Sequence, residues 1–107
     1  MIEISTTDLE LVKDILRKHI PDCEVIAYGS RVTGKSRRYS DLDLSIIGEK
    51  ELPLRTLGDL QEDFEESDLP FRVDLHDWWD TSETFREIIK QKYVTIQKAK
   101  DRSITMF

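Results

Sequence analysis

Hydrophobic residues recur along this 107-residue chain with two periods, one typical of helices and one typical of strands. Spacings of three and four predict helices over residues 7–20, 53–64 and about 82–91, with Thr7 and Glu10 as a capping box at the first. The side chains expected to face the core are Leu9, Val12, Ile15, Leu16 and Ile20, then Leu54, Leu57, Leu60 and Phe64, then Phe85, Ile88 and Ile89.

Alternating or short continuous apolar runs, bounded by turn residues, predict the strands. These are residues 24–28, 41–47, 71–76 and 93–97. One or two helical turns are expected over 30–35. Helices and strands therefore alternate, which predicts an α/β (α+β) fold in which helices pack on a small mixed β-sheet. The length suits one domain spanning residues 1–107.

The net charge and the distribution of basic residues indicate which kinds of partner the protein could bind. The net charge is −6, so no broad basic face for DNA is expected. Arg31, Lys35, Arg37 and Arg38 nevertheless form a local basic patch, which suits a small polyphosphate or an acidic protein partner. The N-terminal residues include acids and form no secretory signal, and no apolar run is long enough for a membrane helix. We therefore expect a cytoplasmic protein with no membrane contact.

Residues 29–36 read GSRVTGKS, which fits the phosphate-loop pattern of ATPases and GTPases. That loop needs a full helix after its lysine, so that free backbone N–H groups face the phosphates. After Ser36 the chain has only one turn's length before a strand pattern begins at Asp41. The phosphate-loop interpretation is therefore set aside.

The same segment supports another interpretation. Gly29 lets the backbone approach a phosphate, and the hydroxyl of Ser30 can bond a phosphate oxygen. Asp41 and Asp43 fall on one face of a strand, where a divalent cation such as Mg²⁺ would relieve their repulsion. Asp74, within a later strand pattern, is the best candidate for a third carboxylate.

Two residues close to Asp74 in sequence, His76 and Asp77, could also belong to the site. Asp77 is less suitable, because it falls at the strand's end on the face of Val73 and Leu75. His76 shares the predicted face of Asp74 and could lie near the site, although an isolated histidine more often has an ordinary hydrogen-bonding role.

These residues resemble the minimal nucleotidyltransferases of the polymerase-beta-type superfamily. That family combines a Gly-Ser pair, a D-x-D pair and a distant third carboxylate on a strand, matched here by Gly29-Ser30, Asp41-Leu42-Asp43 and Asp74. The resemblance implies an enzyme that transfers a nucleoside monophosphate from ATP and releases pyrophosphate. It also implies that Asp41, Asp43 and Asp74 are catalytic and hold Mg²⁺, as two ions, while Gly29 and Ser30 bind the nucleotide. Arg31 is added as a nucleotide contact from the basic patch.

The same resemblance implies a partner. Members of this subfamily are antitoxins of the HEPN/MNT toxin–antitoxin type, and some transfer AMP to a tyrosine of a helical HEPN-domain toxin, so a hetero-oligomer is expected. Two alternatives stay open. The protein could neutralise its partner by binding without catalysis, or it could modify a small-molecule hydroxyl, although relatives of that kind carry extra substrate-binding sequence. Nucleotide preference, acceptor and the number of units added do not follow from the sequence.

Overall fold

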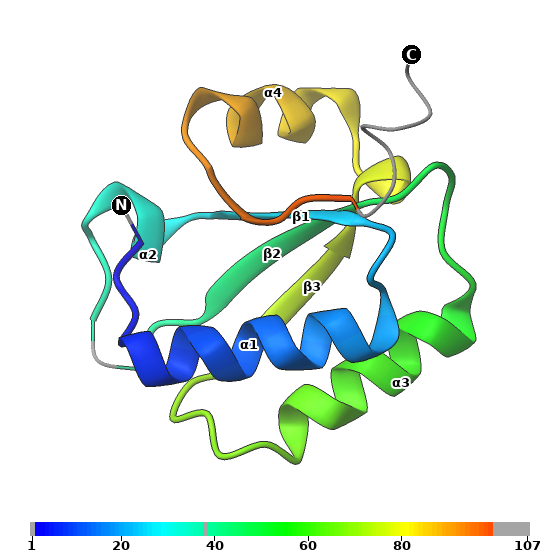
Figure 1. Cartoon of the computed structure of the whole chain (residues 1–107). Helices are drawn as coiled ribbons and strands as arrows, with labels where there is room; N and C mark the ends of the chain where they lie inside the picture. Colours follow the sequence, from blue (N-terminus) through cyan, green and yellow to red (C-terminus); the bar gives the residue numbers. More distant parts are fainter. Residues whose placement is uncertain (1, 38, 100–107) are drawn as a thin grey trace.

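Four strands form one mixed sheet in the order β3-β2-β1-β4 (Figure 1). The computed structural model describes residues 2–37 and 39–99. The strands are β1 (Glu24–Tyr28), β2 (Leu42–Ile47), β3 (Val73–Asp77) and β4 (Val94–Gln97). β1 pairs antiparallel with β2 and with β4, whereas β2 and β3 are parallel. The sheet is therefore mixed, as the sequence predicts.

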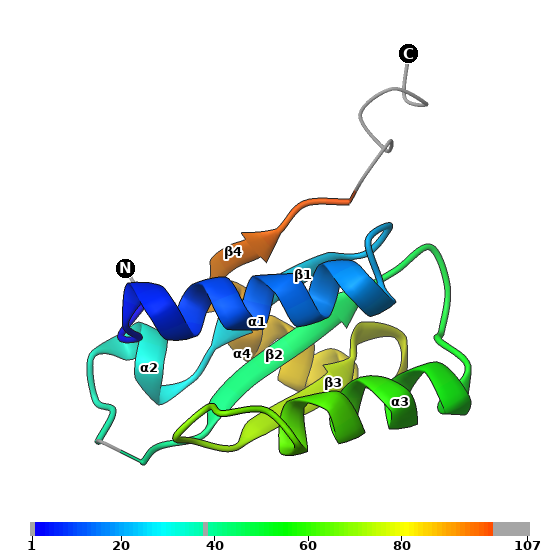
Figure 2. The same ribbon diagram turned by 60° about the horizontal axis from the view of Figure 1, so that its bottom comes forward.

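Helices lie on both faces of this sheet. They are α1 (Thr6–His19), the single-turn α2 (Ser30–Thr33), α3 (Leu54–Glu65) and α4 (Glu83–Gln91), with a short 3-10 helix η1 (Trp78–Asp80) after β3. α1 and α3 lie side by side on one face, and α4 lies on the other (Figures 1 and 2). Within residues 2–37 and 39–99, no helix is long and apolar enough to cross a membrane.

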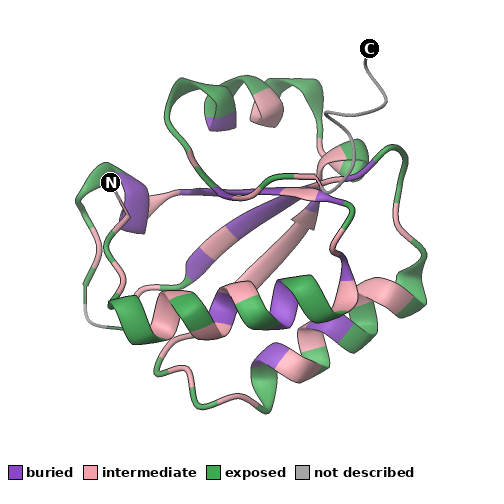
Figure 3. Cartoon of the chain, viewed as in Figure 1, coloured by how far each residue is buried: buried purple, intermediate pink, exposed green. Residues whose placement is uncertain are grey.

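The main core lies between the sheet and the layer of α1 and α3, and Figure 3 shows buried positions in both helices and in the strands. It includes Val12, Ile15 and Leu16 from α1, Leu60 and Phe64 from α3, and Val25, Ala27, Leu42, Leu44, Ile46 and Val73 from the strands. A smaller cluster holds α4 on the opposite face. It consists of Ile26, Tyr28 and Ile89, with Ile47, Trp78 and Phe85 packed against them.

Two apolar residues that were expected in the core are exposed. Leu54 is 86% exposed, because it is the first residue of α3 and precedes the part of the helix that reaches the core. Ile88 is 55% exposed, although the adjacent Ile89 is buried. Successive helix positions differ by about 100°, so a helix that turns Phe85 and Ile89 inward leaves Ile88 at the margin.

The start of α1 and the starts of three strands also differ from the expectation, including β4, which begins at Val94 and not at residue 93. Ser5 caps α1, with its hydroxyl accepting the Asp8 N–H at 3.1 Å, so the predicted capping box at Thr7 is wrong: that residue is already inside the helix. Asp41 and Phe71 precede β2 and β3 instead of beginning them. The expected closing strand is present as β4. Arg38 and residues 100–107 of the predicted loose tail lie outside the described residues.

An ionic contact joins α1 to α3. Nε2 of His19 lies 2.8 Å from Oδ2 of Asp63, and Nζ of Lys18 lies 3.5 Å from the same oxygen. The hydrogen bond with His19, assisted by the Lys18 charge, lowers the pKa of Asp63 below its ordinary value. A carboxylate whose pKa is lowered in the folded state stabilises the fold above its unfolded pKa of about 3.9, and this contribution is lost as the pH falls through the folded value.

We therefore expect Asp63→Asn to lower the free energy of unfolding at pH 7 by up to about 1 kcal/mol, the range of exposed ion pairs. Urea unfolding across pH should show the difference from the unmodified protein shrinking below about pH 4. Glu62→Gln, an exposed position of the same helix, is the matched control. A pH-independent difference for Asp63→Asn would contradict the assignment.

Candidate active site

Three neighbouring strands bring polar side chains into one row across the sheet. Asp43 of β2 is paired with Tyr28 of β1 on one side and with Asp74 of β3 on the other. Paired residues point to the same face, here the face that carries α4. Two carboxylates that are 31 residues apart in sequence thus lie directly opposite each other.

A third group completes this arrangement. One ligand atom from each of Asp43, Asp74 and His76 can be chosen so that all three lie within 4.8 Å of one another. Nε2 of His76 lies 3.1 Å from Oδ2 of Asp74. The His76 ring packs against two aromatic rings, with centroids 6.1 Å from Tyr28 and 6.3 Å from Phe85. From the sequence, His76 was expected only as a residue that could lie near the site. In the structure it belongs to the cluster with Asp43 and Asp74.

The environment of Asp43 opposes its negative charge. Burial raises the pKa of this carboxyl above its ordinary value, and the charges of Asp74 and Asp41 raise it further, while His76 acts in the opposite direction. Asp41 is exposed and lies outside the three-residue cluster, yet its charge acts on Asp43. Asp43 and Asp74 therefore lie together, Asp41 is near enough for its charge to act on Asp43, and the repulsion among these groups favours a bound cation.

Gly29 allows the close approach of β1 to the Asp43 carboxylate. Its φ is +84°, and a Cβ atom built on it would lie 2.4 Å from Oδ2 of Asp43. Gly29 also caps α2, because its carbonyl accepts the N–H groups of Val32 and Thr33, both at 3.0 Å. Glycine is thus required here both by the backbone conformation and by the neighbouring acid.

The phosphate-loop pattern has no corresponding structure. α2 contains four residues and ends at Gly34, which is left-handed with φ +84°. Beyond it, Lys35 is exposed, and the hydroxyl and N–H of Ser36 bond the Glu3 carboxylate. Setting the phosphate loop aside was correct, because the helix that it requires is missing among the described residues.

The Arg31 side chain bonds backbone carbonyls of two other segments of the chain. The side chain is buried; Nε donates to the Ser40 carbonyl at 2.9 Å, and Nη1 donates to the Glu3 carbonyl at 2.7 Å. Its guanidinium lies 4.3 Å from the Phe71 ring centroid. These contacts connect the N-terminal segment to the loop before β2. The assignment of Arg31 to the nucleotide therefore stays a prediction without support from these contacts, and the exposed cations of the patch within the described residues are Lys35 and Arg37.

Asp77 has a structural role. It is buried, Oδ2 accepts the N–H of Leu52 at 2.7 Å, and Oδ1 accepts the N–H of Trp79 at 3.0 Å. Both contacts lie on the side of the sheet away from Asp43, because strand residues alternate between faces. Asp77 therefore fastens two loops and is not part of the acidic cluster.

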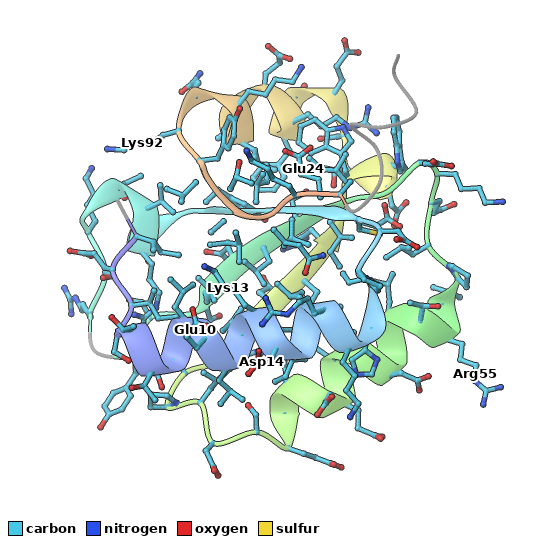
Figure 4. The ribbon with its side chains drawn as sticks, viewed as in Figure 1. Glu10, Lys13, Asp14, Glu24, Arg55 and Lys92 are labelled. Atoms are coloured by element: carbon cyan, nitrogen blue, oxygen red, sulfur yellow. The ribbon has the colours of Figure 1, made fainter. Side chains whose placement is uncertain are left out.

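An open cleft of about 570 Å³ lies over the acidic row, between the sheet and α4. Its lining is Tyr28, Gly29, Thr33, Asp43, Asp74, His76, Phe85, Ile88, Ile89, Gln91 and Lys92. Lys92 follows α4 and points outward from the end of this helix in Figure 4. The cleft thus has an acidic floor, an apolar wall and one cationic side chain at its margin.

Sequence reasoning missed Tyr28 as part of this site. Its ring is buried, and its hydroxyl has no hydrogen-bond partner among the described residues. Burial and the charges of Asp43 and Asp74 raise the Tyr28 pKa above its ordinary value, so the hydroxyl keeps its proton. Its position in the sequence could have indicated this role, because Tyr28 directly precedes Gly29 and points to the same face of the strand as Ile26.

Comparison with known proteins agrees with this geometry. Residues 10–102 match the family described as "Polymerase beta, Nucleotidyltransferase". The chain belongs to this family. A curated relative of this nucleotidyltransferase, "Probable protein adenylyltransferase MntA" from Haemophilus influenzae, is 54% identical over 97 residues, which cover 91% of this chain and 85% of the relative.

Solved structures show the same nucleotidyltransferase fold. A crystal structure described as a toxin–antitoxin with AMP-PNP superposes with a TM-score of 0.71 at 20% identity, covering 91% of this chain and 77% of that chain. A Shewanella oneidensis complex, described as a tri-AMPylated HEPN toxin with an MNT antitoxin, gives a TM-score of 0.61 at 18% identity, over 92% and 78% of the two chains. At this identity the likeness shows the fold alone.

The side chains present in this nucleotidyltransferase fit the divalent metal that the fold family implies. Carboxylate oxygens are the ligands that hard divalent cations prefer, and Asp43 and Asp74 present them from facing positions. The raised pKa of Asp43 indicates an excess of negative charge that a cation would offset. The charge of Asp41 acts on the same carboxyl and adds to this excess.

Proposed function

We propose that this protein, as one domain over residues 1–107, is a protein adenylyltransferase that moves AMP from ATP to a tyrosine of a helical HEPN-type toxin and so acts as an antitoxin. The observation that carries the proposal is the pairing of Asp43 with Asp74 beside Gly29, in a chain 54% identical to a relative described as a probable protein adenylyltransferase. A cytoplasmic location, inferred from the sequence, is part of the same proposal.

Each residue has a distinct role in the proposed site. Asp41, Asp43 and Asp74 would hold Mg²⁺, as two ions. The backbone at Gly29 and the hydroxyl of Ser30 contact the phosphates. Arg31 is left out of this set, since its guanidinium bonds the carbonyls of residues 3 and 40.

The reaction is an in-line displacement at the α-phosphorus. The tyrosine oxygen forms a bond to that phosphorus while the bond to the bridging oxygen of the β-phosphate breaks, and pyrophosphate leaves. The phenolic proton passes to Asp74, which lies at the cleft floor. The bound metal supplies stabilisation of the charge that develops on the phosphate oxygens.

The cleft is open, and part of its wall is exposed. Ile88 lines it and is 55% exposed. An acceptor tyrosine carried by a partner protein could enter from this side, with its ring against the apolar residues of α4 and its oxygen toward Asp74. The partner would then complete the cleft, as part of a hetero-oligomer.

The direct test is incubation with ATP labelled on the α-phosphate, Mg²⁺ and the purified helical partner. We expect the label on one or more partner tyrosines, detected by mass spectrometry, and no transfer when chelator is present. A partner with the modified tyrosine replaced by phenylalanine is the control. Label that appears without the partner, or on no tyrosine, would contradict the proposal.

Neutralisation by binding alone makes a different prediction. A binding antitoxin would protect against the toxin without Mg²⁺ and with Asp43→Asn as well as with the unmodified chain. Co-purification of the two proteins and the activity of the toxin, both measured with and without ATP, distinguish neutralisation by binding from neutralisation by AMP transfer. The opposed carboxylates favour catalysis, because a surface used only for binding has no need to hold like charges together.

A further inference from the structure

We infer that His76 is a positioning residue for the proposed reaction: its imidazole holds one oxygen of Asp74, so that the other oxygen faces the metal site. This inference rests on the proposed function. It starts from the contact between Nε2 of His76 and Oδ2 of Asp74 at 3.1 Å. A carboxylate accepts hydrogen bonds and does not donate them, so Nε2 carries the proton in this contact.

The sheet places the two side chains for this contact. Asp74 and His76 are two residues apart on β3, so both point to the α4 face. In the parallel register Asp74 lies opposite Asp43, whereas His76 lies opposite Ser45, two residues farther along both strands. His76 therefore approaches Asp74 along the strand, and its nitrogen lies within 4.8 Å of carboxylate oxygens of both Asp43 and Asp74.

Packing fixes the direction of the imidazole. Tyr28 and Phe85 contact its ring, with interplanar angles of 54° and 66°. These two rings also pack against each other in an edge-to-face arrangement, with centroids 5.8 Å apart. A ring held by two others has little rotational freedom, so its Nε2 presents the donor in one direction. Asp74 is 40% exposed in its side chain and would otherwise be free to turn toward solvent.

Residues that bond ligating carboxylates from outside affect metal affinity roughly 10–100-fold. The test compares three replacements at His76 by Mn²⁺ titration, with free Mn²⁺ followed by electron paramagnetic resonance. The amide nitrogen of His76→Gln matches the position of Nε2, whereas that of His76→Asn matches Nδ1 and falls short. His76→Phe keeps the ring but removes the donor.

We expect His76→Asn and His76→Phe to weaken Mn²⁺ binding about tenfold or more, and His76→Gln to remain within about threefold of the unmodified protein. AMP transfer should follow the same order, mainly through the turnover rate. Thermal unfolding without metal shows whether each variant is folded. The inference would be overturned if all three variants bound Mn²⁺ as tightly as the unmodified protein does. It would also be overturned if His76→Gln lost as much Mn²⁺ affinity as His76→Asn.

Asp74→Asn separates this inference from the proposed function. If that change weakens Mn²⁺ binding while the His76 replacements do not, only the positioning role is wrong. If Asp74→Asn leaves Mn²⁺ binding unchanged, the proposed metal site itself fails. A nitrogen coupling to bound Mn²⁺ that disappears in His76→Gln would show that His76 is a ligand, which also overturns the positioning role.

Discussion

Asp43→Asn is expected to remove AMP transfer almost completely. Asp43 is the central member of the row that runs from Tyr28 to Asp74, and it is the half-buried carboxylate on which the charges of Asp74 and Asp41 both act. Loss of a metal ligand removes several kcal/mol of transition-state stabilisation, which corresponds to a rate loss of roughly a hundredfold or more. The measurement is the initial rate of label transfer at saturating ATP.

The same replacement should not harm the fold. Burial and neighbouring charges disfavour the ionised form of Asp43, so a neutral amide of the same shape relieves an unfavourable interaction in the metal-free protein. We expect thermal unfolding without metal at the same temperature as the unmodified chain, or higher. Asp59→Asn, at an exposed position of α3, is the matched control and should retain full activity. Full activity in Asp43→Asn would contradict the proposed mechanism.

The sequence predicts the elements well, because each depends on a local pattern. The helical spacing around Val12 and Leu60 and the alternation around Leu44 are properties of neighbouring residues, and the structure confirms the elements that they predict. Errors arise at the ends of elements. Leu54 has the correct spacing for burial, but it lies where the helix has not yet reached the core.

The site was predictable only in part, for a physical reason. The spacing from Gly29-Ser30 to Asp43 can be read in the sequence, but the position of Asp74 opposite Asp43 depends on the parallel register of β2 and β3. For Arg31, the neighbouring residues in the sequence suggest a contact different from those that the structure shows. A cation beside a phosphate motif suggests an anion contact, yet backbone carbonyls from distant segments accept its hydrogen bonds. Periodicity contains no information about either relation.

Gly29→Ala is expected to combine a loss of stability with a loss of activity. A backbone at φ +84° and ψ −159° is a conformation essentially restricted to glycine, and a side chain there costs on the order of 1–3 kcal/mol. The new Cβ would also lie 2.4 Å from Oδ2 of Asp43, so the carboxylate must move. A displacement of about 1 Å of a catalytic group can lower a rate about a hundredfold.

Gly34→Ala separates these two effects. Gly34 has the same φ of +84°, but nothing lies within 4 Å of the Cβ position. We expect it to lower the free energy of unfolding by about 1–2 kcal/mol, as a left-handed alanine does, while AMP transfer and Mn²⁺ binding stay close to those of the unmodified chain. Urea unfolding and label transfer, measured below both unfolding transitions, make the comparison. If Gly34→Ala lost as much activity as Gly29→Ala, backbone strain in α2 would be the cause; activity lost only in Gly29→Ala identifies the displaced Asp43 carboxylate.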